Sequence, residues 1–222
     1  MKRVIVILVA IVLAALVLLW PRRAARGYTS IDARWEPPVV IDSVLSPQEC
    51  ERLMKTADPL FSRSSLVGVN GPDATRTSET AWISKQNPMA RKILDRACEL
   101  TGKSFENCED LQVVRYKPGT YYKAHHDSCC EDSQACIDFE DRGGQRVGTL
   151  LVYLNDGFED GETHFPRHGD AKMRAQTGCA IFFRPMGAED ARCHPNALHA
   201  GLPITSGTKY VCNAWVREGI FK

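Results

Sequence analysis

The chain has 222 residues, with 28 Lys and Arg against 27 Asp and Glu, and its formal net charge at pH 7 is +1. This balance leaves no basic excess to neutralise phosphates, which argues against a nucleic-acid-binding protein. Hydrophobic residues make up 44% of the chain, and the length is sufficient for one domain with a sizeable core plus a short appendage.

The chain begins with an apolar segment between basic residues. Residues 4–20 carry no charge over seventeen positions, which is at the short end of what spans a bilayer as a helix. A cleaved secretory signal peptide is the alternative, but no small-x-small cleavage site follows the apolar run, so we favour an uncleaved signal anchor. Basic residues on both sides leave its orientation open. We assign residues 1–26 to this transmembrane anchor, 27–37 to a linker and 38–222 to the folded domain.

Two helices are predicted in the first half of that domain. Residues 39–41 are apolar and predict a short strand before them. Ser46 followed by Pro47 is a typical helix start, with a serine cap and a proline in the first turn. Asn87 opens a second helix, whose apolar residues recur at helical spacing until Gly102 ends it.

From residue 111 onward the pattern changes to short strands that are separated by turn signals. The predicted strands are residues 111–116, 149–154, 179–183 and 210–216. Two helices followed by short strands predict a mainly β fold with flanking helices (α+β), in which the helices pack on the outside of a β-barrel or sandwich.

One candidate metal site stands out among the predicted strands. His125 and Asp127 are separated by one residue, so on an extended strand both side chains leave the same face. With His199 from a distant strand they make a set of two histidines and one carboxylate, which leaves coordination positions open and suits non-haem Fe(II). Lys209 lies ten residues after His199, an even number, so a strand could present both on one face.

Other histidines compete for the ligand role, namely His126, His164, His168 and His194. His126 would leave the strand on the opposite face from His125, and for His164 and His194 we prefer a solvated or structural role. A structural zinc site is the alternative metal centre. It is disfavoured because the set offers three ligands rather than a closed four, and no Cys-x-x-Cys pair completes it.

The sequence contains nine cysteines: Cys50, Cys98, Cys108, Cys129, Cys130, Cys136, Cys179, Cys193 and Cys212. Behind a secretory anchor they predict a partly disulfide-bonded domain in an oxidising compartment, with at least one thiol unpaired. Cys129, Cys130 and Cys136 cluster in an acidic insertion after the metal motif, where disulfide stapling is favoured over a second metal site. Cys179 and Cys212 lie in predicted strands and are expected to be buried and free.

Several segments, in order, carry a family resemblance: Arg-Thr-Ser-Glu-Thr-Ala-Trp at 76–82, Leu-Gln-Val-Val-Arg-Tyr at 111–116, Tyr-Lys-Ala-His-His-Asp at 122–127, Arg-Val-Gly-Thr-Leu-Leu-Val-Tyr-Leu-Asn-Asp at 146–156, Gly-Glu-Thr-His-Phe-Pro at 161–166, and His199 through Lys209 to Trp215. Together they resemble the prolyl 4-hydroxylase family of Fe(II)/2-oxoglutarate dioxygenases, over most of the predicted domain. The resemblance implies a double-stranded β-helix, a jelly-roll or cupin-like barrel whose open mouth can hold a metal and a small co-substrate.

The resemblance also implies a role for each matching residue. His125, Asp127 and His199 would hold Fe(II). Lys209 would pair with the distal carboxylate of 2-oxoglutarate as a compact point charge, and Tyr116 resembles the family tyrosine that donates its hydroxyl to the same carboxylate.

Three further residues, Tyr122, Arg146 and Trp215, match family residues that engage the peptide substrate. Arg217 departs from the pattern, because relatives often carry His there. The tyrosines also have a purely structural interpretation, since tyrosine is common in strands and in cores with a polar edge.

The resemblance implies a membrane-anchored peptidyl-proline 4-hydroxylase, with residues 38–222 as the catalytic domain in the lumen of the endoplasmic reticulum or secretory pathway. It would couple oxidative decarboxylation of 2-oxoglutarate with O2 to hydroxylation of proline in a peptide or protein, with ascorbate as a further cofactor. Three alternatives stay open: a hydroxylase acting on another residue or a small molecule, a non-catalytic module that binds proline-rich segments, and a redox or zinc protein that uses the cysteines.

Overall fold

The computed structural model describes residues 35–64, 74–187 and 193–222. The predicted anchor at 1–26 lies outside these ranges. Within them, no helix combines the length and the apolar character that crossing a bilayer requires. Trp35, which the sequence assigned to the linker, is buried and its indole Nε1 donates to the carbonyl of Arg184 over 3.0 Å. The end of the predicted linker therefore contacts the folded domain.

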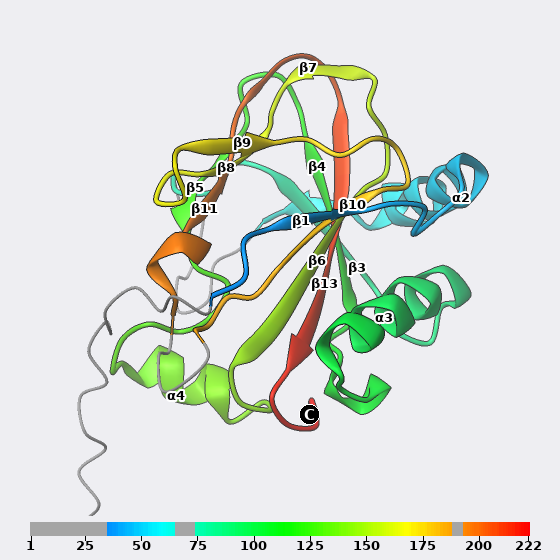
Figure 1. The fold of residues 1–222 in the computed structure, drawn as a ribbon. Helices are drawn as coiled ribbons and strands as arrows, with labels where there is room; N and C mark the ends of the chain where they lie inside the picture. The colour runs from blue at the N-terminus through cyan, green and yellow to red at the C-terminus, as the bar shows by residue number, and fades with distance from the viewer. Residues whose placement is uncertain (1–34, 65–73, 188–192) are drawn as a thin grey trace, which may run out of the picture.

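A seven-stranded antiparallel sheet runs through the middle of the molecule (Figure 1). In spatial order its strands are β1 (Val39–Ile41), β10 (Ala180–Phe183), β6 (Arg146–Tyr153), β13 (Lys209–Arg217), β4 (Leu111–Tyr116), β3 (Glu79–Ile83) and β2 (Ser62–Arg63). The four predicted strands of the second half are β4, β6, β10 and β13, with ends shifted by up to three residues.

A smaller four-stranded sheet faces one side of the large sheet. Its strands in order are β5 (Tyr122–His125), β11 (His199–Gly201), β8 (Thr163–Phe165) and β9 (Ala171–Met173), and a separate pair joins β12 (Ile204–Gly207) to β7 (Phe158–Asp160). All of these pairings are antiparallel. The result is a mainly β fold with a few helices, consistent with the predicted jelly-roll.

The helices cover the other side of the large sheet (Figure 1). They are α2 (Pro47–Ala57) and α3 (Pro88–Thr101). Ser46 and Glu49 form a capping box at the start of α2, Asn87 caps α3, and Gly102 ends α3 in the left-handed conformation with φ of 69°. Both predicted helices are therefore confirmed, and so are the two starts and the stop of α3 at Gly102.

The large sheet has a hydrophobic core on each face, because successive side chains of a strand point to opposite sides. Val113, Leu150 and Cys212 join the cluster under α2 and α3. Val114 and Leu151, one position along, join the cluster between the two sheets. This second core holds the smaller sheet in place, and the candidate site is built at its edge.

The remaining helices are short. They are α4 (Gln134–Glu140) and the 3-10 helices η1 (Asp58–Leu60), η2 (Phe105–Asn107) and η3 (Pro195–Ala197). Helix α4 was not predicted. It lies within the acidic insertion after the metal motif, and Ser133 caps its first turn by accepting from the backbone amide of Cys136.

Candidate active site

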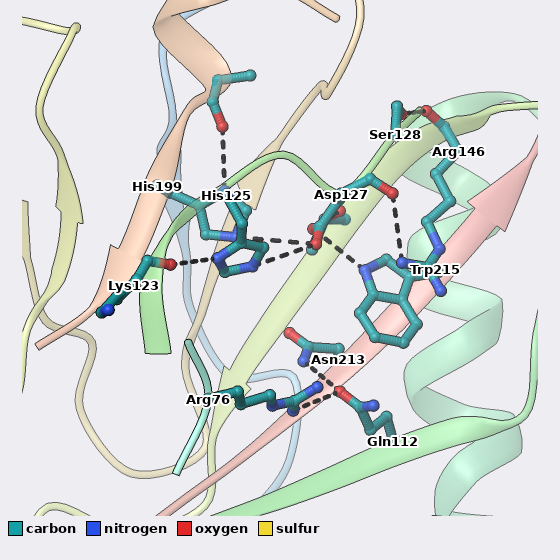
Figure 2. Close-up of polar contacts among 12 residues, drawn as sticks. Arg76, Gln112, Lys123, His125, Asp127, Ser128, Arg146, His199, Asn213 and Trp215 are labelled. Atoms are coloured by element: carbon teal, nitrogen blue, oxygen red, sulfur yellow. Dashed lines mark hydrogen bonds and ion pairs between the residues drawn. The ribbon is translucent and has the colours of Figure 1, made fainter. Parts of the chain in front are cut away.

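Two histidines and one aspartate converge at the edge of the smaller sheet. His125 ends β5, His199 begins β11, and their Cα atoms are register partners. Asp127 lies just beyond β5, and its Oδ1 is 3.7 Å from Nε2 of His125 and 3.8 Å from Nε2 of His199 (Figure 2). Two ligand atoms that each lie about 2.1 Å from one ion can be up to about 4.2 Å apart. The ligand atoms of all three side chains lie within 4.8 Å of one another, so together they could hold one metal ion.

The two imidazoles are held with the same ring nitrogen toward Asp127. Nδ1 of His125 lies 2.8 Å from the carbonyl oxygen of Lys123, and Nδ1 of His199 lies 3.0 Å from that of Ala197. Because a carbonyl only accepts, each Nδ1 carries the proton and donates it. The lone pair of each Nε2 is left facing the centre of the set, which is the arrangement that metal-binding histidines use.

Asp127 is held by its other oxygen. Its Oδ2 accepts from the hydroxyl of Thr149 over 2.7 Å and from the indole Nε1 of Trp215 over 3.1 Å. Oδ1 remains directed at the two imidazoles (Figure 2). Burial alone would raise the pKa of Asp127, but the two imidazoles and a nearby guanidinium lower it to about 2. The carboxylate is thus anionic and offers one oxygen to a cation.

Lys209 and Tyr116 lie together in the lining of the same cavity. They are register partners on β13 and β4, and both side chains are buried. The Lys209 ammonium donates to the carbonyl of Gly161 over 2.6 Å and lies 5.2 Å from the centre of the Tyr116 ring. Burial lowers the pKa of Lys209 to about 7, although Glu162 opposes the shift. An anionic ligand beside this ammonium would offset part of the cost of burying it.

All eight residues that the sequence predicted for the site line one cavity of about 630 Å³. The expectation that one strand presents His199 and Lys209 on the same face was wrong, because β11 ends at Gly201 and Lys209 starts β13. Asp127 likewise lies outside the strand that ends at His125. The side chains still converge, since the cavity lies between the two sheets.

The mouth of the cavity combines aromatic rings with guanidinium groups. Tyr122 stacks on His125 with ring centres 3.5 Å apart, and the Arg76 guanidinium lies 4.6 Å from the Tyr122 ring centre. On the other side, the Arg146 guanidinium lies 3.5 Å from the centre of the Trp215 ring. The three predicted substrate residues therefore frame the opening beside the metal set.

The structure also reveals residues that the sequence did not point to. Glu109 accepts two hydrogen bonds from Arg146, from Nε at 2.6 Å and from Nη2 at 2.9 Å. Thr149 holds the oxygen of Asp127 that faces away from the imidazoles. Glu109 lies two positions before the 111–116 motif. No sequence signal marked it, because an acid next to a strand is ordinarily exposed.

Arg217, the departure from the family pattern, is fully buried behind the cavity wall. It is the register partner of Arg146 across β6 and β13, and its Nε donates to the same oxygen of Glu109 over 2.8 Å. Its Nη1 donates to the carbonyls of Phe139 and Gly144, each over 2.7 Å. Burial lowers the pKa of Arg217 to about 10, with Glu109 opposing the shift. Arg217 thus helps to fix the Glu109 carboxylate that holds Arg146.

The competing histidines have structural partners. His164 Nε2 lies 2.6 Å from a carboxylate oxygen of Asp170. His194 stacks on Trp35 with ring centres 4.8 Å apart, and His168 meets the same indole edge-on. His126 lies near the sulfurs of Cys130 and Cys193, which together could offer three metal ligands. Both sulfurs are taken up by a disulfide.

The predicted stapling of the acidic insertion is confirmed. Cys129 is bonded to Cys136 in α4, and Cys130 is bonded to Cys193, which lies six residues before His199. Cys179 and Cys212 are both free, as expected, but only Cys212 is buried. The side chain at 179 is half-exposed because it immediately precedes β10, outside the core of the strand.

Comparisons with known proteins agree with this geometry. A family model described as the 2OG-Fe(II) oxygenase superfamily matches residues 111–217. The chain is 44% identical over 196 residues to a protein of Acanthamoeba polyphaga mimivirus named for prolyl 4-hydroxylase, covering 88% of this chain and 80% of the relative. It is 32% identical over 204 residues to prolyl 4-hydroxylase 1 of Arabidopsis thaliana, covering 83% and 70%.

One solved structure extends the similarity to three dimensions. The viral collagen prolyl hydroxylase of Paramecium Bursaria Chlorella virus-1, in its 2OG complex, superposes with a TM-score of 0.64 at 31% sequence identity. The match covers 85% of this chain and 98% of that chain.

Proposed function

This chain belongs to the prolyl 4-hydroxylase family of 2OG-Fe(II) oxygenases, and we propose that it hydroxylates C4 of proline in peptide or protein substrates. The reaction couples this hydroxylation to the oxidative decarboxylation of 2-oxoglutarate by O2. The observation that carries the proposal is one cavity that is lined by a buried lysine, by the His/Asp/His set and by aromatic and guanidinium groups.

The donor set fits Fe(II). His125 and His199 each turn an Nε2 lone pair inward, and Asp127 adds one anionic oxygen while its second oxygen is occupied. Three ligands of this kind leave positions for oxygen and a co-substrate. Bound Fe(II) would supply the redox chemistry that links O2 reduction to decarboxylation and to oxidation of a C–H bond.

Lys209 and Tyr116 are proposed to hold the distal carboxylate of 2-oxoglutarate. Lys209 provides a positive charge in a desolvated position, and the neighbouring hydroxyl of Tyr116 can donate to the same carboxylate. A Cβ built on Gly201 would lie 3.0 Å from that hydroxyl. The absence of a side chain at Gly201 therefore leaves Tyr116 the room that a ligand contact needs.

The mouth suits an extended, proline-rich segment. Proline-rich peptides dock in grooves that are lined by aromatic rings, because their PPII conformation is largely preformed. Tyr122 and Trp215 present such rings next to the metal set, and Arg146 can bind a peptide carbonyl. Glu109 fixes the position of the Arg146 guanidinium by two parallel hydrogen bonds.

The remaining parts of the proposal concern the whole chain. Residues 1–26 form a membrane anchor, 27–37 a linker and 38–222 the catalytic domain, which faces the lumen of the endoplasmic reticulum or another secretory compartment. The two disulfides support an oxidising compartment. Ascorbate is proposed as a further cofactor on the basis of family membership.

The test uses the full chain with Fe(II), 2-oxoglutarate, ascorbate and a short proline-rich peptide, and follows succinate and the peptide mass. We expect one added oxygen on proline, no product with His199→Ala, and partial recovery of Lys209→Ala at high 2-oxoglutarate concentration. Succinate without peptide oxidation would redirect the proposal to another substrate. Absence of both products from the metal-loaded protein would overturn it in favour of a binding module.

A further inference from the structure

Two cysteines outside the disulfides meet behind the candidate site. Cys98 lies in the last turn of α3, and Cys108 follows η2 and precedes β4. Their sulfur atoms are 3.3 Å apart, although the two side chains are not bonded to each other in this structure. Since only ten residues separate them, this contact closes a short loop at the edge of the helical core.

Cys108 belongs to the packed structure that supports the substrate wall. Its side chain is completely buried in the core under α2 and α3, and its backbone forms an isolated bridge with Val216 of β13. The next residue, Glu109, holds Arg146 through two hydrogen bonds, and the Glu109 amide donates to the carbonyl of Trp215. A covalent bond at Cys108 would therefore anchor the segment that carries Glu109.

We propose that Cys98 and Cys108 are a disulfide-forming pair, which joins the end of α3 to the start of β4 as a third intramolecular cross-link. The oxidant is a disulfide of the glutathione type. The Cys98 thiolate attacks it and forms a mixed disulfide with release of one thiol, and Cys108 then displaces the second thiol. Two protein thiols are oxidised, one oxidant disulfide is reduced to two thiols, and the two protons pass to the released thiolates.

The surroundings of the two sulfurs place this reaction during folding. Cys98 is half-buried, whereas Cys108 is completely buried. Burial raises the pKa of both thiols, that of Cys108 far above its ordinary value, which makes both poor nucleophiles once the protein is folded. The bond therefore forms during folding, before the core closes over Cys108. The disulfides of Cys129 with Cys136 and of Cys130 with Cys193 form under the same oxidising conditions.

Trypsin offers a direct test, because Lys103 lies between the two cysteines. Cleavage gives peptide 97–103 with Cys98 and peptide 104–115 with Cys108. The full chain is folded with oxidised and reduced glutathione, denatured without reductant, alkylated and digested. We expect the two peptides as one species, two hydrogens lighter than their sum, which separates after reduction. Recovery of both peptides as separate, alkylated species before reduction would overturn the proposal.

A stability measurement provides the second test. Cys98→Ser, Cys108→Ser and the double variant are melted beside wild type, with Cys179→Ser as the control for a half-exposed free cysteine. Loss of a cross-link that closes a loop of this length lowers Tm by about 5–10 °C in a chain of this size. We expect Cys98→Ser alone to cause most of the loss seen in the double variant, since either change removes the same bond. A Tm of Cys98→Ser equal to that of Cys179→Ser would contradict the proposal.

Discussion

The indole Nε1 of Trp215 donates to Oδ2 of Asp127 over 3.1 Å, which ties the wall of the substrate mouth to the aspartate of the metal set. The same indole carries the Arg146 guanidinium on its face. One side chain therefore orients a proposed metal ligand with its edge and a proposed substrate contact with its ring. Figure 2 shows this arrangement, with the two imidazoles facing the opposite side of Asp127.

Trp215→Phe is expected to weaken metal binding more than it weakens peptide binding. The change removes the donor to Asp127 but keeps an aromatic face for Arg146. Loss of an outer hydrogen bond to a metal ligand typically reduces metal affinity 10–100-fold. Titration with Mn²⁺ in place of Fe(II) measures this without turnover. Trp82→Phe is the matched control, since this half-exposed indole lies 6.2 Å from Trp215, and an equal loss there would contradict the role of the hydrogen bond.

The binding of 2-oxoglutarate is expected to weaken as pH rises above 7. Burial lowers the pKa of Lys209 to about 7, so the free protein loses the ammonium charge as pH rises through that value. The dianionic ligand prefers the protonated form, and the apparent Kd should rise about tenfold per pH unit above 7. Calorimetric titration of the metal-loaded protein without O2 at several pH values checks this.

The control for that pH dependence removes the charge at position 209 and keeps a side chain of similar length. Lys209→Met should bind 2-oxoglutarate weakly at every pH, whereas Lys55→Met, on the exposed face of α2, should behave as wild type. A slope that persists in Lys209→Met would assign the titration to another group.

Gly201→Ala is expected to lower the affinity for 2-oxoglutarate while the protein stays folded. The added Cβ would meet the Tyr116 hydroxyl at 3.0 Å and its ring carbon at 3.3 Å, so the phenol must turn away from the ligand. Gly157→Ala is the control, because a Cβ there would meet nothing within 4 Å. Unchanged 2-oxoglutarate binding in Gly201→Ala would argue against a role for Tyr116.

The local features of the fold could be predicted from the sequence, whereas the features that depend on strand register could not. The starts of α2 and α3 follow from Ser46 and Asn87, whose capping is a contact within one turn. Helix α4 has only seven residues, too few for a hydrophobic period to emerge. The strands of the smaller sheet have three or four residues each, and only their packing on the larger sheet stabilises them.

The network around Glu109 illustrates the same limit. Glu109, Arg146 and Arg217 are far apart in the sequence and meet because β6 pairs with β13 in one register, which places the two arginines opposite each other. Register is set by tertiary packing and cannot be read from the residues of one strand. The His-x-Asp spacing was easier to recognise, because both residues belong to one short segment.

Arg217→Gln is expected to destabilise the fold by about 3–5 kcal/mol, the usual cost of breaking one side of a buried ion pair. Burial alone would raise the pKa of Glu109, but Arg146 and Arg217 outweigh it and lower it. Both guanidiniums share one oxygen of that carboxylate. Denaturant unfolding measures the loss, and Arg91→Gln in an exposed pair with Asp95 should change stability by less than about 1 kcal/mol.

The same substitution also tests whether Arg217 positions Arg146 through Glu109, apart from its effect on the stability of the fold. Without Arg217, the Glu109 carboxylate keeps one partner and loses its fixed position, so Arg146 becomes less well placed. The KM for peptide should rise severalfold while kcat changes less, and Arg217→Lys should recover part of the loss by restoring the charge. Equal falls in kcat for Arg217→Gln and Arg217→Lys, with KM unchanged, would contradict this positioning role of Arg217.

The bond between Cys130 and Cys193 joins the two segments that supply the metal set. Cys130 lies three residues after Asp127, Cys193 lies six before His199, and 63 residues separate the two cysteines. Both sulfurs lie within 3.5 Å of the carbonyl of Ser128. The disulfide therefore limits how far Asp127 and His199 can move apart before metal binds.

Replacing both of these cysteines by serine is expected to weaken Mn²⁺ binding severalfold, because ordering the ligands then costs additional entropy when the ion binds. The double variant Cys129→Ser/Cys136→Ser is the matched control. It removes the neighbouring disulfide, which ties the chain to α4 and makes no connection to the His199 segment. An equal loss of affinity in both double variants would mean that the insertion as a whole stabilises the site. A loss confined to the Cys130 and Cys193 variant would assign the effect to the link between the two ligand-bearing segments.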